Sequence, residues 1–188
     1  MSRSASLDCS PGVQFPTMAT PLQDDPFDVL GLPAAFDLDR TQLERAYLAK
    51  AAQAHPDTSG SDVLAAQINQ AKRTLEDPER RANALLARLG GPSKEHNRDL
   101  PPGFLMELMS AREEMEEIAQ SEDAQALDTF RQMAEKRRSG HIDRISMLVR
   151  DLDLPPTPES LAQIRVELNA WRYAERMIEQ IQPNTTVQ

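Results

Sequence analysis

The sequence predicts an all-α protein, and three observations support this fold class. Aromatic residues make up only 4% of the 188 residues, and no stretch alternates apolar and polar side chains as a half-buried strand does. Alanine, leucine, glutamate, glutamine and arginine, which all favour helices, dominate the composition. Apolar residues also recur at steps of three and four, which places them on one face of a helix. A chain of this length can bury one moderate core or two small ones.

The first 24 residues predict a disordered tail. They contain Pro11, Gly12, Pro16 and Pro21 among many serines and threonines, and no periodic apolar pattern. Cys9, the single cysteine, lies in this tail, so one chain can build neither a disulfide framework nor a cysteine metal site. We expect a cytoplasmic protein without a cofactor.

A short helix is expected from Pro26 or Phe27 to Leu30. Asp25 is suited to cap its N-terminus, Pro26 to occupy its first position, and Gly31 to end it. A second helix should follow Asp39, which forms a capping-box pattern with Gln42. The expected buried stripe of this second helix is Leu43, Ala46, Tyr47 and Ala51 or Ala54.

The tripeptide His55-Pro56-Asp57 must end the second helix. Pro56 has no backbone N–H and disfavours the helical conformation of the residue before it. His55 and Asp57 could in principle act as a base and its orienting carboxylate. Yet the sequence has only three histidines, and no nucleophile motif, glycine-rich phosphate loop or paired-histidine metal spacing accompanies them. We therefore expect a protein that is not an enzyme.

Two further helices are expected before residue 92. The third begins near Ser61 or Asp62 and should pair antiparallel with the second. The fourth is capped by Asp77-Pro78 and ends at Gly90-Gly91. The expected inward positions are Leu64, Ile68, Ala71 and Leu75 on the third helix, and Ala82, Leu85, Leu86 and Leu89 on the fourth.

Residues 93–103 predict a linker, because Pro92, Pro101 and Pro102 flank or occupy a strongly polar segment. We therefore expect one unit over residues 25–92 and a second over 104–182, with a short disordered tail at 183–188.

The second unit predicts a three-helix, coiled-coil-like bundle. Its first helix runs from Phe104 to about Gln120, and the second opens at Ser121 and ends near Asp151. Gly140 should weaken or bend this second helix, at a cost of about 1 kcal/mol, rather than break it. Thr157 is the expected N-cap of the last helix.

The charge and hydropathy of the chain exclude two classes of partner. The net charge is −9, whereas nucleic-acid affinity rests on lysine and arginine that neutralise phosphates. No apolar run approaches the length of a membrane span, and the first 24 residues lack the features of a secretory signal. We expect neither nucleic acid nor membrane as a partner.

Several motifs of the first unit occur in an order that resembles the J domain of DnaJ-type co-chaperones. They are PFDVLGL at 26–32, HPD at 55–57, INQA at 68–71 and DP at 77–78. The resemblance implies that the HPD loop and the helix before it bind a DnaK-type ATP-dependent chaperone and stimulate its ATP hydrolysis. The implied contact residues are His55, Pro56, Asp57, Arg45, Tyr47 and Lys50.

The basic face of the second helix is thinner than in typical J domains. Arg40, Arg45 and Lys50 are present, but Thr58 stands where the family usually has a lysine. Because lost steering charges mainly lower the association rate, we expect a weak or specialised chaperone contact. The alternative is that Arg45 and Lys50 only form a solvated helix face.

The second unit narrows the resemblance. FLMELM at 104–109, REEMEEI at 112–118, and Arg80-Arg81-Ala82 with Leu85-Leu86 are similar to segments of HscB, the J-type co-chaperone of iron-sulfur cluster assembly. The similarity covers residues 25–182. It implies an L-shaped protein whose J domain binds an HscA-type chaperone and whose bundle binds the scaffold protein IscU.

The resemblance also implies client-binding residues. These are Leu105, Met106, Met109, Glu113 and Glu117 on the first bundle helix, with Trp171 or its neighbour Ala170 on the last. Ser110 stands where the family has an acid. Iron-sulfur binding by the chain itself is not expected, because a cluster needs several thiolates.

Other interpretations of this helix remain open. Leucine and methionine at helical spacing are usually core residues. Helix geometry allows Leu105, Leu108 and Met115 to point inward while the two methionines and two glutamates share a neighbouring face. The chain could also be a J-domain co-chaperone for a different client, or a helical interaction protein with a degenerate HPD.

Overall fold

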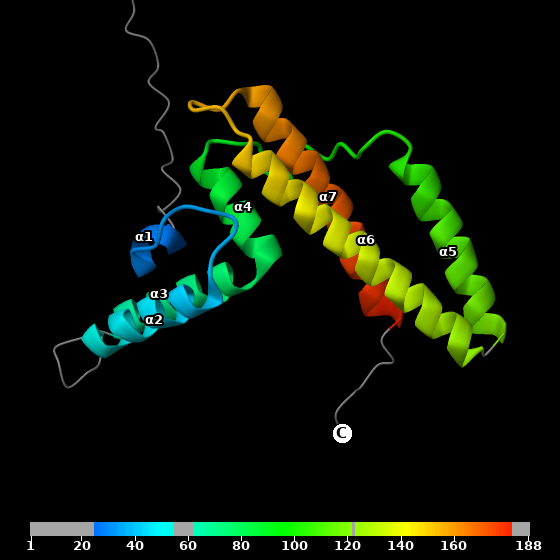
Figure 1. Ribbon diagram of the computed structural model, residues 1–188, viewed down its shortest axis with the longest axis horizontal. Helices are drawn as coiled ribbons and strands as arrows, with labels where there is room; N and C mark the ends of the chain where they lie inside the picture. Colours follow the sequence, from blue (N-terminus) through cyan, green and yellow to red (C-terminus); the bar gives the residue numbers. More distant parts are fainter. Residues whose placement is uncertain (1–24, 55–61, 122, 182–188) are drawn as a thin grey trace, which may run out of the picture.

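The structure is a computed structural model that describes residues 25–54, 62–121 and 123–181. Across these ranges it contains helices and no strand, which confirms the all-α class (Figure 1). The helices are α1 (Pro26–Leu30), α2 (Arg40–Gln53), α3 (Asp62–Glu76), α4 (Pro78–Arg88), α5 (Phe104–Ser121), α6 (Ala124–Arg150) and α7 (Pro158–Ile181). The two predicted tails and the HPD tripeptide lie outside the described residues.

Local capping explains where the helices begin. The carboxylates of Asp25, Asp39 and Asp77 accept backbone N–H bonds at the starts of α1, α2 and α4, as predicted. Gly31 ends α1 with a left-handed φ of 66°. The predicted opening of α6 at Ser121 is wrong: Asp123 caps this helix, because its carboxylate accepts from the backbone of both Gln125 and Ala126.

The helix α6 runs without interruption through Gly140 over 27 residues. The expectation that this glycine does not break the helix is confirmed. At the start of α7, the Thr157 hydroxyl accepts from the Ser160 backbone N–H at 3.2 Å, which confirms the predicted cap.

The helices α2 and α3 form an antiparallel pair, as predicted. The Tyr47 hydroxyl donates to Asn69 Oδ1 at 3.0 Å, and Lys72 Nζ lies 2.8 Å from Glu44 Oε2 and 4.2 Å from the centre of the Tyr47 ring. A step of three residues forward along α2, from Glu44 to Tyr47, therefore corresponds to a step of three residues backward along α3, from Lys72 to Asn69. The expectation that Leu64 points inward on α3 is wrong: it lies in the first turn of the helix and is 41% exposed.

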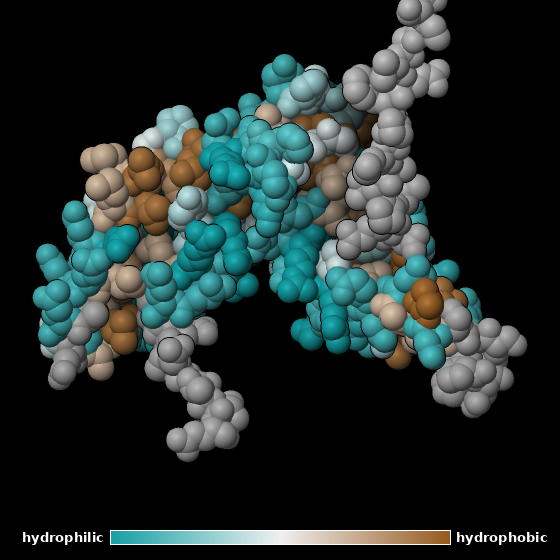
Figure 2. Space-filling view, turned by 180° about the vertical axis from the view of Figure 1, so that it is seen from behind, coloured by the Kyte–Doolittle hydropathy of each residue, from teal (hydrophilic) through white to brown (hydrophobic). Residues whose placement is uncertain are grey.

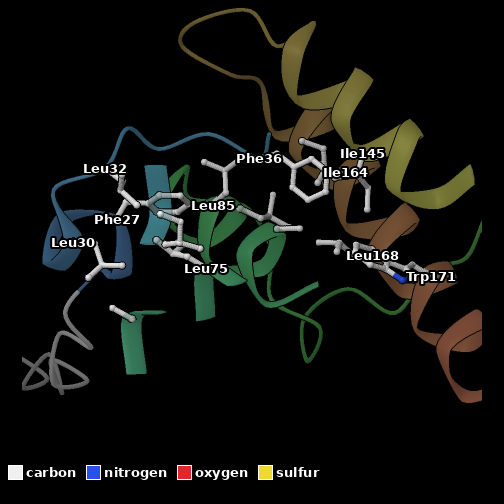
Figure 3. Packing of buried hydrophobic residues seen from close by; sticks show 14 of the residues in the cluster. Phe27, Leu30, Leu32, Phe36, Leu75, Leu85, Ile145, Ile164, Leu168 and Trp171 are labelled. Atoms are coloured by element: carbon white, nitrogen blue, oxygen red, sulfur yellow. The ribbon is translucent and has the colours of Figure 1, made fainter. Parts of the chain in front are cut away.

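A single hydrophobic core joins the two predicted units. The buried side chains of α1 to α4 are continuous with those of α6 and α7, and Figure 3 shows Phe36 beside Ile145 and Ile164. We call this cluster the shared core. Its buried members are Phe27, Leu30, Leu32, Phe36, Leu43, Ala54, Ile68, Ala71, Leu75, Ala82, Leu85, Leu86, Ile145, Leu161, Ile164, Leu168 and Trp171.

The predicted linker is fixed on the surface of α7. Arg165 Nε donates to the Pro92 carbonyl at 2.9 Å, and Asn169 Nδ2 donates to the carbonyls of Asn97 and Asp99 at 3.1 and 3.0 Å. These bonds satisfy backbone acceptors that a free segment would leave to water. The molecule is L-shaped, with one arm made of α1 to α4 and the other of α5 to α7 (Figure 1). The two arms meet at a joint that is held by both apolar and polar contacts.

The helix α5 packs on a second, smaller cluster, made of Ala111, Phe130, Ala134, Met177 and Ile178. At its start, the Phe104 ring lies edge-on to the His141 ring, with centroids 6.0 Å apart, and 5.9 Å from the Tyr173 ring. Few side chains therefore connect α5 to the rest of the bundle.

An ionic cluster under Phe104 supports the start of α5. His141 is 5% exposed and its Nδ1 lies 2.8 Å from Glu167 Oε2, while Arg144 Nε lies 3.1 Å from Glu167 Oε1. Burial raises the pKa of the Glu167 carboxyl, but the hydrogen bonds from His141 and Arg144 outweigh burial and hold that pKa below its ordinary value.

The shared core predicts that a cavity in α7 weakens both arms. Ile164→Ala should lower the free energy of unfolding by about 2 to 5 kcal/mol, measured by urea denaturation. Amide hydrogen exchange should accelerate in α3 and α4 as well as in α7. Met147→Ala, at a position 57% exposed on α6, is the control and should change stability by less than about 0.5 kcal/mol. Unchanged exchange in α3 and α4 would mean that the two arms unfold independently.

The Glu167 cluster predicts a pH-dependent contribution to stability. A carboxyl whose pKa is lowered in the folded state stabilises that state above its unfolded pKa, and the contribution is lost as the pH falls through the folded pKa. Glu167→Gln should therefore cost roughly 1 to 3 kcal/mol at pH 7. The difference from the unmodified chain should shrink as the pH falls below the ordinary carboxyl pKa of about 4.5. Glu114→Gln, an exposed change on α5, is the control. A difference that is constant with pH would contradict this role.

Candidate functional site

The hairpin of α2 and α3 carries the predicted chaperone contact. The HPD tripeptide lies outside the described residues, between Gln53 at the end of α2 and Asp62 at the start of α3. The antiparallel pairing of these helices brings the two ends of that loop to the same end of one arm (Figure 1).

The predicted residues of α2 do not share one face. Tyr47 is half-buried and bonded to α3, whereas Arg45 is exposed and lies about 200° around the helix from it. Lys50 lies about 60° from Tyr47. Among the residues that the structure describes, no carboxylate lies within ion-pair distance of Arg45 or Lys50. Both positive charges are therefore available to an acidic partner.

Sequence reasoning missed two exposed apolar side chains on this hairpin, Leu48 on α2 and Val63 on α3. Leu48 is 57% and Val63 68% exposed, and neither belongs to the buried stripe of its helix. Figure 2 shows brown surface at the end of this arm. The sequence could have indicated their exposure, because both residues fall outside the predicted buried stripes of their helices.

The second surface is the outer face of α5, which consists of Leu105, Met106, Met109, Glu113 and Glu117. These residues cover an arc of about 120° of the helix. The apolar members are 60%, 70% and 53% exposed, and both glutamates are exposed. Figure 2 shows this apolar surface, in brown, on the arm that carries α5. The structure thus brings together the predicted residues of this helix.

The opposite face of α5 makes the contacts with the bundle. Leu108, Met115 and Ile118 are half-buried around the buried Ala111. The expectation that Leu105 points inward is wrong, because the preceding residue, Phe104, fills the position against His141 and Tyr173. The methionines of the outer face are therefore not core residues.

Trp171 does not belong to this surface, which corrects the predicted aromatic contact. It is 0% exposed, as is Ala170, and it is among the largest fully buried side chains. Its Nε1 donates to Glu175 Oε1 at 2.8 Å, and Arg138 Nε pairs with the same carboxylate oxygen at 2.7 Å. A tryptophan in the shared core stabilises α7 and is not available to a partner.

The described ranges contain neither a candidate metal site nor a candidate membrane span. No group of three or more histidine, cysteine, aspartate or glutamate side chains there could hold a metal ion. None of the helices described is long and apolar enough to cross a membrane.

Comparison with known families gives two matches in tandem. Residues 25–84 match the model of the DnaJ domain, and residues 100–182 match the model described as the HSCB C-terminal oligomerisation domain. The unmatched residues between them overlap the linker.

The curated relatives of this chain include proteins named as HscB co-chaperones. The co-chaperone protein HscB homolog of Burkholderia multivorans is 35% identical over 138 residues, which cover 68% of this chain and 79% of the relative. That of Paraburkholderia xenovorans is 38% identical over 119 residues, which cover 58% of this chain and 68% of the relative.

Solved structures share the fold. Chaperone HscB from Vibrio cholerae has a TM-score of 0.66 at 26% identity, covering 84% of this chain and 95% of that one. The human co-chaperone protein HscB has a TM-score of 0.68 at 20% identity, covering 96% of this chain and 91% of that one. With a J domain in the first arm, a matching C-terminal domain in the second and relatives more than a third identical, this chain belongs to the HscB family of co-chaperones.

Proposed function

We propose that this co-chaperone binds an IscU-like iron-sulfur scaffold protein through the outer face of α5 and delivers it to an HscA/DnaK-type chaperone. The HPD loop then stimulates ATP hydrolysis by that chaperone, which promotes cluster transfer in the cytoplasm. The observation that carries the proposal is the outer face itself: three large apolar side chains, each more than half exposed, beside two carboxylates on one folded helix.

Exposed apolar groups of this size are typical of binding surfaces. Methionine has a flexible, polarisable side chain that adapts to the shape of a partner. Met106 and Met109 lie one helical turn apart, and Glu113 and Glu117 continue the same face. Such a face suits a client with an apolar patch bordered by basic side chains.

The chaperone contact is supported by the sequence of the loop and by the hairpin that carries it. Pro56 restricts the direction of the chain, and the Asp57 carboxylate suits a charge-assisted hydrogen bond to an arginine of the chaperone. Arg45 and Lys50 add positive charge without a pairing acid in the described part of the chain. Because they lie on different sides of α2, we infer weaker electrostatic steering than a continuous basic face would give.

A second candidate function keeps the J domain but assigns a different client to the bundle. Two observations favour it: Ser110 replaces a family acid, and Trp171 is buried. Capture from a cell extract on immobilised protein, followed by mass spectrometry, separates the two candidates. Recovery of a small cysteine-bearing scaffold protein supports the first, and its absence among the captured proteins supports the second.

Replacing the loop carboxylate should abolish the effect on the chaperone. Asp57→Asn should reduce stimulated ATP turnover of an HscA/DnaK-type chaperone to its basal rate, with an unchanged helical circular dichroism spectrum. Asp39→Asn makes the same chemical change at the other end of α2, where asparagine caps a helix as well as aspartate, and should retain stimulation. Full stimulation by the Asp57 variant would remove the HPD mechanism.

Truncating the two methionines should weaken client binding without unfolding the helix. Met106→Ala with Met109→Ala should reduce affinity for the scaffold at least about tenfold by isothermal titration calorimetry. Stability should change by less than about 0.5 kcal/mol. Met177→Ala, at a position 8% exposed beneath α5, is the matched control and should cost about 2 to 5 kcal/mol of stability. Unchanged affinity in the double variant would move the client to another surface.

A further inference from the structure

A cationic cavity lies at the joint of the two arms, between α4, the linker and α7. Its volume is about 640 Å³. The charged side chains that line it are Lys94, Arg98, Arg165, Arg172 and Arg176 on the positive side, and Glu79 and Glu95 on the negative side. Positive groups thus exceed negative ones by three, in a chain whose net charge is −9.

Arg165 is the most informative of these residues, because it is buried and forms no ion pair with a carboxylate in the described ranges. It is 5% exposed, and its hydrogen bonds go to neutral acceptors: Nε to the Pro92 carbonyl and Nη1 to Asn83 Oδ1, both at 2.9 Å. Across the described ranges, no carboxylate lies within ion-pair distance of this guanidinium, and none of the acceptors bonds to its Nη2. Burial lowers the pKa of Arg165, and the carboxylates of Glu95 and Glu79, beyond ion-pair distance, offset this effect only in part. An anion in the cavity would stabilise the buried charge further.

The surrounding arginines are unequally neutralised. Arg172 Nη1 donates to Glu79 Oε2 at 3.4 Å and lies 3.9 Å from Glu179 Oε1. Arg176 lies over the Tyr173 ring at 5.7 Å. Within the described part of the chain, neither Arg176 nor Arg98 has a carboxylate in ion-pair range.

The two acids of the cavity offset only two of its five positive charges. Glu79 accepts from Arg172, although burial raises the pKa of this carboxyl. Glu95 lies beside another cation of the cavity: its Oε1 is 4.0 Å from Lys94 Nζ, and a hydrogen bond from Ser93 lowers its pKa.

We propose that this cavity binds a phosphate group, carried either by inorganic phosphate or by a nucleotide. Guanidinium groups match phosphate oxygens with paired N–H donors, and several of them can bond one phosphate from different sides. The excess of three positive charges suits a multiply charged anion. The volume lies in the range of small-molecule sites and leaves room for more than the phosphate itself.

The placement of the cavity gives such a ligand a defined effect. Asn83 and Glu79 come from α4, the segment between the arms supplies Gly91 to Glu95 and Arg98, and α7 supplies Arg165 and its neighbours. A bound phosphate would contact both arms and the segment between them. Binding would therefore stabilise the joint, in proportion to the ligand concentration relative to its Kd.

Titration of the full chain with phosphate tests the site. Inorganic phosphate should give a saturable heat and raise the melting temperature, whereas sodium chloride of equal ionic strength should not. Arg98→Gln and Arg176→Gln, two exposed positions, should each weaken phosphate binding about tenfold and leave the melting temperature in sodium chloride unchanged. Arg112→Gln on α5, outside the cavity, should bind like the unmodified chain.

Further arms of the same experiment identify the source of the phosphate. ADP that binds at least about tenfold tighter than inorganic phosphate indicates a nucleotide, and similar affinities indicate phosphate alone; both support the site. Two results would overturn the proposal: no saturable effect beyond the sodium chloride control, or equal binding by the cavity variants and the unmodified chain. A glutamate-rich peptide that binds where phosphate does not would also overturn it.

Discussion

The arrangement of this molecule depends on burying one face of α4 and the loop before α2 against α6 and α7. Phe36 meets Ile145 and Ile164 there, so apolar side chains from distant parts of the sequence form one continuous cluster. Because the burial of apolar surface is the main favourable contribution to folding, this contact turns two helical arms into one body. The polar contacts of Arg165 and Asn169 then fix the linker over the seam.

The sequence predicted the helices and most of their ends, because those features are local. A capping aspartate determines where its helix begins through bonds to backbone N–H groups within the next few residues, as at Asp25 and Asp39. The start of α6 was misjudged because two capping residues, Ser121 and Asp123, lie close together and the carboxylate forms the bonds. The shared core was not predicted, since periodicity shows which face of a helix is buried but not which helix covers it.

The outer face of α5 also shows what helical periodicity can and cannot predict. Helical spacing correctly separated Met106 and Met109 from the inward positions, but it could not decide between Phe104 and Leu105 at the first turn. Nor could it show that Trp171 is fully buried, because a tryptophan serves equally well as a core residue and as a binding residue. The cationic cavity has no signal in any single segment, since its residues come from three of them.

The contacts at the joint distinguish this molecule from two domains on a flexible linker. Domains connected by a free tether sample many separations, and the effective concentration of one bound partner near the other then depends on linker length. Here the segment between the arms is hydrogen-bonded along α7, so it is not a free tether. For the proposed function, the distance and the angle between the two binding surfaces then depend on the packing of the joint and not on the length of the linker.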